Sequence, residues 1–205
     1  MAFYNETVDN SVFDYGVGGA KDAFNYYAEG YRRAAETLTK SLRRRRGFLN
    51  CEALPVVFLY RHAFELSLKH AIYKAAEYAD YADSSNLEAR LHNDHNLRRL
   101  AGIVVDSLKR LFSDDLYLQK LLPRITATSC ELADLDASSY VSRYPIDTIG
   151  HPSTDAIQFV NLRLFARHMS SLLEEMDTLN VYLDNITDTA QEAFTEWFRN
   201  LDYSP

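Results

Sequence analysis

Apolar residues recur every three or four positions along most of the chain, which is the periodicity of amphipathic helices. The first such segment covers residues 21–46. A second follows Pro55 and is apolar round most of its circumference, so we expect it to be the central helix. A third is predicted to begin at Asp94 or Asn96, since either side chain can cap its amino end.

Two further periodic segments follow these three. One is interrupted by Pro123 and extends to about Leu135. The other begins near Thr154 or Asp155 and is expected to fray or bend after Asn180. With 7 glycines and 5 prolines in 205 residues, turn signals are scarce and long helices are favoured. The sequence therefore predicts an all-α, antiparallel up-and-down bundle of about five main helices.

The expected organisation has three parts. Residues 1–20 show no sustained period and predict an irregular arm, residues 21–185 form the bundle, and residues 186–205 form an acidic helical appendage. A chain of this length buries enough surface for a core of its own. The composition, 47% hydrophobic and 25% charged, is that of a folded globular protein rather than a disordered one.

The charge is distributed unevenly along the chain. The whole sequence carries 22 basic and 29 acidic residues, a net charge of −7, but residues 31–46 hold seven basic residues and only one acid, Glu36. Cations at the carboxyl end of a helix stabilise it through the helix dipole. The same block is a candidate surface for phosphate, formed by Lys40, Arg43, Arg44, Arg45 and Arg46.

Cys51 and Cys130 lie far apart in a sequence without a recognisable signal peptide, so we expect free thiols in a cytoplasmic setting. No run of 18 or more apolar residues is present, which argues against a membrane span. His92 and His95 lack a visible third ligand, and phosphate loops and dinucleotide fingerprints are absent. No metal and no cofactor are therefore predicted.

Four polar residues interrupt the apolar second segment: Arg61, His62, Glu65 and Lys69. Polar groups on a buried helix need partners. They form either an internal salt-bridge network, with Arg143 reaching Glu65, or a polar pocket that binds a nucleotide or an RNA phosphate at a dimer interface.

Three segments together resemble the HEPN family, the higher eukaryotes and prokaryotes nucleotide-binding helical domains. Residues 58–69 resemble the Glu-Leu-x-Leu-Lys core of its second helix, residues 95–100 resemble the His-Asp-Leu-x-x-Leu at its third, and residues 139–145 resemble an Arg-Tyr-Pro loop. The resemblance implies a helical bundle that dimerises and acts in toxin–antitoxin systems, phage defence or RNA processing.

Catalytic members of that family are metal-independent endoribonucleases with an Arg-x4-6-His motif. The resemblance would make Arg the group that stabilises phosphate charge and His the group that moves a proton. Arg143 and His151 are separated by seven residues, one more than the motif allows, whereas Arg163 and His168 have an allowed spacing. On a helix, however, the latter two would lie about 140° apart, and the place of His168 beside the apolar stripe from Leu164 to Leu172 favours a partly buried core residue over a catalytic one.

Three functions remain open from the sequence. The first is a HEPN-like nucleotide- or RNA-handling module in a bacterial defence or toxin–antitoxin system, acting as a homodimer. The second is an active endoribonuclease of the same fold. The third is a non-catalytic scaffold that binds a protein partner through its acidic C-terminal region.

Overall fold

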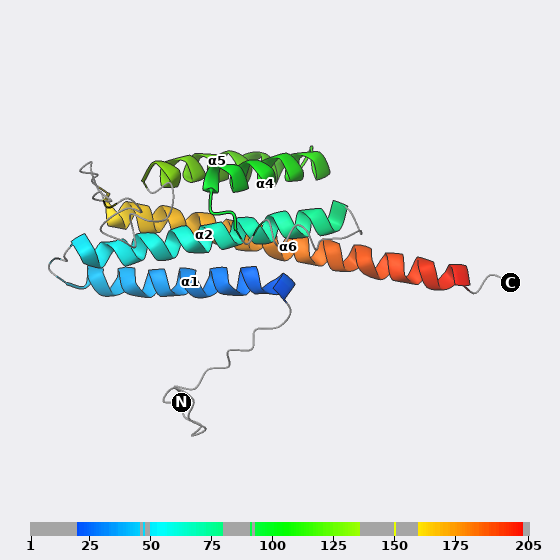
Figure 1. Cartoon of the computed structure of the whole chain (residues 1–205), viewed down its shortest axis with the longest axis horizontal. Helices are drawn as coiled ribbons and strands as arrows, with labels where there is room; N and C mark the ends of the chain where they lie inside the picture. Colours follow the sequence, from blue (N-terminus) through cyan, green and yellow to red (C-terminus); the bar gives the residue numbers. More distant parts are fainter. Residues whose placement is uncertain are drawn as a thin grey trace, which may run out of the picture.

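The computed structural model describes residues 20–45, 47, 50–79, 91, 93–135, 150 and 160–202. Those residues form five helices and contain no strand, which confirms the all-α bundle (Figure 1). The predicted N-terminal arm falls almost entirely outside them. The helices are α1 (Ala20–Arg43), α2 (Asn50–Ala79), α4 (Leu97–Leu111), α5 (Leu116–Leu135) and α6 (Leu162–Asp202).

Helix α2 is the central element, since it packs against α1, α4 and α6. The long helices α1, α2 and α6 lie side by side, and α4 and α5 form a pair above them in Figure 1. Contacts fix the directions: Tyr60 bonds Ser170 and His70 bonds Asp184, so α2 and α6 run parallel. Helix α1 is antiparallel to both. Successive helices alternate in direction except α2 and α4, which run the same way.

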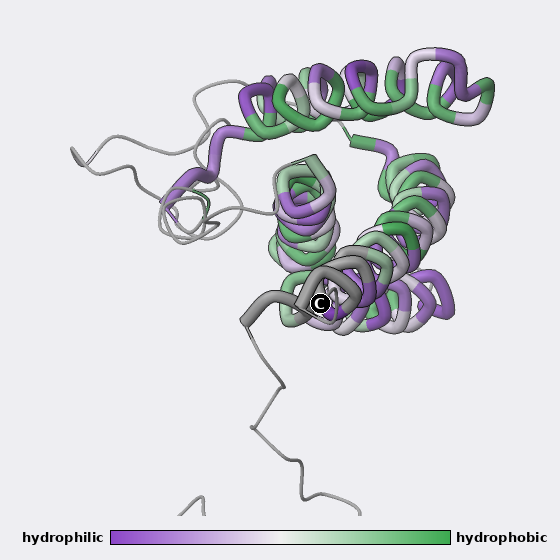
Figure 2. Tube along the Cα trace, turned by 90° about the vertical axis from the view of Figure 1, so that its right-hand side faces the viewer, coloured by the Kyte–Doolittle hydropathy of each residue, from purple (hydrophilic) through white to green (hydrophobic). Residues whose placement is uncertain are grey.

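The core follows from the apolar stripes of these helices. Residues buried on α2 point to three neighbours, which is why this helix is apolar round most of its circumference. In Figure 2, hydrophobic and hydrophilic residues alternate along the helices, some of which are seen nearly end-on and one from the side. The residues at the centre of the core include Phe64, Leu68, Leu100, Val104, Ile125, Leu172 and Met176.

The amino end of α4 is capped as the sequence predicts. Asn96 is the N-cap, and its side-chain oxygen accepts a hydrogen bond of 3.1 Å from the backbone N–H of Arg99. Asp94 accepts a further bond from the N–H of Asn96 at 2.9 Å. The start of α2 differs from the prediction, because the helix begins at Asn50, more than one turn before Pro55.

Pro123 does not interrupt its helix. Helix α5 is continuous through Pro123, about two turns after its start at Leu116. Asp115 caps the first turn by accepting bonds from the N–H groups of Tyr117 and Leu118. Burial of the apolar side chains on either side of the proline offsets the one backbone hydrogen bond that proline removes.

Helix α6 is also longer than predicted. It begins at Leu162, where Asn161 accepts a bond of 3.1 Å from the N–H of Leu164, and it continues to Asp202 as one helix that does not fray after Asn180. The boundary predicted at residue 185 therefore lies inside one helix. The C-terminal part of α6 extends past the ends of α1 and α2 (Figure 1).

Candidate functional site

A buried ion network joins α2 to the segment that precedes α4. Glu65 lies at its centre: it accepts bonds from Arg61 at 3.2 Å and from Lys69 at 2.9 Å. The ring Nδ1 of His95 lies 2.8 Å from the same carboxylate, and Arg61 also donates to the backbone oxygen of His95 at 3.2 Å. Arg61 and Glu65 are each only 1% exposed, whereas the His95 side chain is 59% exposed.

These contacts match the salt-bridge network considered for the second segment, with Lys69 and His95 as the partners of Glu65. Arg143, the partner expected from the sequence, lies outside the described residues. Burial alone would raise the pKa of Glu65, but the charge and hydrogen bond of Lys69, together with His95, lower it overall. Glu65 is therefore ionised at neutral pH.

This lowered pKa predicts a loss of stability in acid. A group whose folded pKa is below its unfolded value stabilises the fold above the unfolded pKa, and that stabilisation is lost as pH falls through the folded pKa. For Glu65 we expect the loss to begin below about pH 4.5. Urea denaturation between pH 3 and 7 measures it, and in Glu65→Gln the acid-dependent part of the profile should shrink. An unchanged profile in this variant would contradict the assignment.

His62 does not belong to the network. Its ring stacks on Phe58, with centroids 5.6 Å apart, and meets the edge of Tyr31 at 4.5 Å. Burial lowers the pKa of His62 below its ordinary value and outweighs the opposing charge of Glu65. The structure therefore places His62 as a neutral aromatic residue in the contact between α1 and α2.

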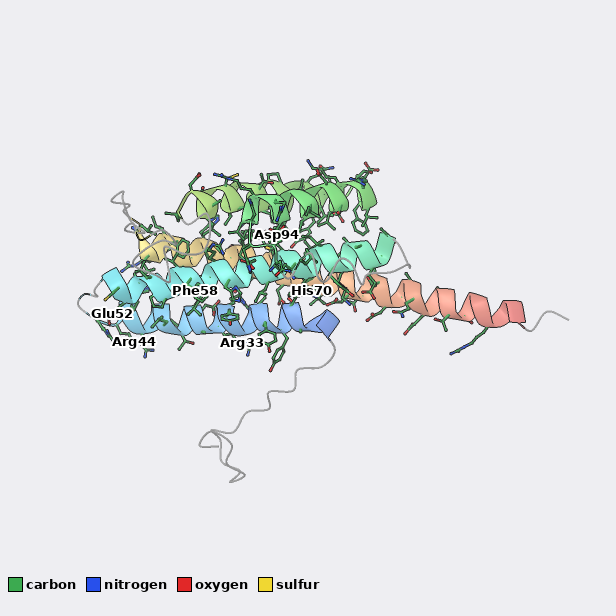
Figure 3. All side chains as sticks on the ribbon, viewed as in Figure 1. Arg33, Arg44, Glu52, Phe58, His70 and Asp94 are labelled. Carbon is green, nitrogen blue, oxygen red and sulfur yellow. The ribbon has the colours of Figure 1, made fainter. Side chains whose placement is uncertain are left out.

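The basic block lies where α1 ends and α2 begins. Lys40, Arg43, Arg44 and Arg45 are all exposed, and Arg45 pairs with Glu52 near the start of α2. Figure 3 labels Arg44 and Glu52 at this end of the bundle. Arg46 lies outside the described residues. Helix α1 ends at Arg43, so Lys40 and Arg43 are in its last turn, where they stabilise the helix dipole.

Two exposed arginines of α6 lie at the same end of the bundle. Arg32 of α1 contacts Glu174 of α6 at 3.7 Å, and the two helices are antiparallel. Eleven residues, or about three turns, lead from Arg32 to Arg43 and from Glu174 back to Arg163. Eleven residues of an α-helix return to within about 20° of the same face. Arg43 and Arg163 therefore lie level with each other on facing stripes, and Arg167 lies on the stripe of Arg163.

We call Lys40, Arg43, Arg44, Arg163 and Arg167 the basic face. None of the five has an ion-pair partner among the described residues. Sequence reasoning identified Arg163 only as a catalytic candidate and did not consider Arg167, since joining α6 to α1 requires the register between helices that are far apart in sequence.

The proposed catalytic pair on α6 is separated. Arg163 is exposed, while Nε2 of His168 lies 2.7 Å from the hydroxyl of Thr128 on α5. His168 is exposed, so it is not the core residue that the alternative interpretation expected. The two side chains lie on faces about 140° apart and no contact joins them. Arg143 and His151 lie outside the described residues.

A polar pocket that the sequence did not indicate lies between α1, α2 and α6. His70 and Lys74 of α2 both contact Asp184 of α6, at 3.1 and 3.2 Å (Figure 3 labels His70). Burial alone would raise the pKa of Asp184, but His70 and Lys74 lower it overall. The only available signal was the spacing of Asp177, Asp184 and Asp188, which places three acids on one face of a helix.

Comparison with protein-family models, with curated proteins and with solved structures finds no match for this chain. No described helix combines the length and apolarity needed to cross a membrane. Among the described residues, no group of three or more His, Cys, Asp or Glu side chains could hold a metal ion.

Proposed function

We propose that this chain is a HEPN-like RNA-handling module, of the kind that acts in bacterial defence or toxin–antitoxin systems as a cytoplasmic homodimer. The observation that carries the proposal is the basic face, on which exposed cations of two helices gather at one end of an otherwise acidic protein. The motif resemblance in residues 58–69 and 95–100 supports the same class of protein.

The spacing of the basic face favours RNA over a single nucleotide. Lys40 and Arg43 are about one turn apart on α1, as are Arg163 and Arg167 on α6, so the cations form a surface rather than one enclosed pocket. A surface of this kind suits a phosphate backbone, which it binds by releasing counterions. Binding is proposed in place of cleavage, since the contacts of His168 do not bring it to Arg163.

The proposal predicts salt-dependent RNA binding that needs the basic face. We expect the double variant Arg43→Ala/Arg163→Ala to raise the Kd for a short fluorescein-labelled single-stranded RNA about tenfold. Because two phosphate contacts are removed, the slope of log K against log salt should fall in magnitude by about 1.4. Fluorescence anisotropy across a series of KCl concentrations measures both quantities.

Lys109→Ala/Arg110→Ala is the matched control. It removes the same charge from two exposed residues in the last turn of α4, away from the basic face. RNA binding by this control should stay within about twofold of the wild type. If the wild type does not bind RNA, or if both double variants lose affinity equally, the basic face is not the RNA-binding surface.

A further inference from the structure

The pocket between α1, α2 and α6 has the size and charge of a ligand site. Its volume is about 690 Å³, within the range of small-molecule sites. Five carboxylates line it, against one lysine and one histidine, so it carries an excess of four negative charges when His70 is neutral. The carboxylates are Glu29, Glu77, Asp177, Asp184 and Asp188.

Two of these acids are available to a ligand. Glu29 pairs with Arg32 and Arg33, and Asp184 pairs with Lys74. Asp177 and Asp188, by contrast, have no salt bridge within the described part of the chain, and Asp177 interacts with Arg32 only through its charge. They lie eleven residues apart on one face of α6, about 16 Å along the helix, with Asp184 between them.

One buried polar atom in the pocket lining lacks a hydrogen-bond partner among the described residues. It is Nδ1 of His70, whose side chain is 1% exposed. Oδ1 of the buried Asn180 is also unpaired, and the amide nitrogen of the same side chain donates to the lining residue Asn25. Unpaired buried polar atoms are costly. The unpaired nitrogen of His70 therefore favours a polar ligand in the pocket.

An aromatic ring supplies a second reason to expect a cation. Tyr26 lines the pocket and is 68% exposed, with Tyr27 packed against its ring at 6.3 Å. An exposed tyrosine ring beside carboxylates attracts ammonium or guanidinium groups through cation–π interaction. A single metal ion does not fit, because the described residues include no group of acids close enough to hold one.

We propose that this pocket binds an elongated organic cation with several ammonium or guanidinium groups. Asp177, Asp184 and Asp188 follow each other at two turns and about one turn of α6, or about 10 and 6 Å. The interval between Asp177 and Asp188, about 16 Å, matches the length of an extended linear tetraamine whose nitrogens are separated by three or four methylene groups. Asp177 and Asp188 hold the two ends of the cation, and the ring of Tyr26 covers one positive group.

Calorimetric titration of the full chain with spermine tests this site. Asp177→Asn/Asp188→Asn should raise the Kd for spermine at least tenfold, and Tyr26→Ala should raise it severalfold without affecting the fold, because Tyr26 is exposed. The matched control is Asp106→Asn/Asp114→Asn, which removes the same charge from exposed positions outside the pocket. It should leave the Kd unchanged. Circular dichroism checks that each variant is folded.

A short peptide with arginines one and two turns apart is titrated in parallel to distinguish a free polyamine from a side chain of a protein partner. Preference for either probe, with dependence on Asp177 and Asp188, supports the site and identifies the source of the cation. No binding of either probe, or equal losses in the pocket and control variants, overturns the proposal. RNA binding at the basic face is measured separately, since the pocket variants leave that face intact.

Discussion

Replacing Glu65 with alanine is expected to lower the free energy of unfolding by about 3 to 5 kcal/mol. The carboxylate is the shared partner of Arg61 and Lys69, which are 1% and 3% exposed. Its removal leaves two buried cations with no compensating charge, which costs far more than the intact network contributes. Urea denaturation at fixed protein concentration, followed by circular dichroism, measures the change.

A triple variant separates a structural network from a binding site. Replacing Arg61, Glu65 and Lys69 together by Met, Leu and Met removes every charge and retains the approximate volume. Well-packed apolar replacements of buried ion pairs are often neutral or stabilising, so we expect the triple variant to be more stable than Glu65→Ala. If it is stable but has lost RNA binding, the network also takes part in recognition. If it is less stable than Glu65→Ala, buried charge is not the cause of the single-variant effect.

The helices could be predicted because their signal is local. Periodicity along α1 and α4 specifies which face is buried, and the cap at Asn96 depends only on residues within one turn. Neighbouring residues alone could not predict that α5 continues through Pro123 or that α6 continues past Asn180. Burial of residues on both sides of Pro123 against other helices, and of Leu179 and Leu183 on α6, outweighs the weak sequence signals for a break.

The polar sites also divide into features that nearby sequence predicts and features that depend on tertiary packing. Three of the five residues of the basic face were visible as part of a cluster at the end of one helix, and the polar residues on α2 were conspicuous in an apolar segment. The role of His95 as a partner of Glu65 requires contacts across 30 residues of sequence, and the contact of Asp184 with His70 spans 114. The pattern of residues within one segment cannot predict these contacts, because they depend on how packed helices are aligned with one another.

Phe64→Ala should destabilise the fold by about 3 to 5 kcal/mol through loss of packing rather than charge. Phe64 is 0% exposed on the central helix, so deleting its ring leaves a cavity among α2 and its neighbours. The control is Leu116→Ala: Leu116 is 72% exposed at the start of α5, and its loss should change stability by no more than about 0.5 kcal/mol. Unlike the Glu65 effect, the Phe64 effect should persist at low pH, because no ionisable group is removed. Similar losses for Phe64→Ala and Leu116→Ala would contradict the central position assigned to α2.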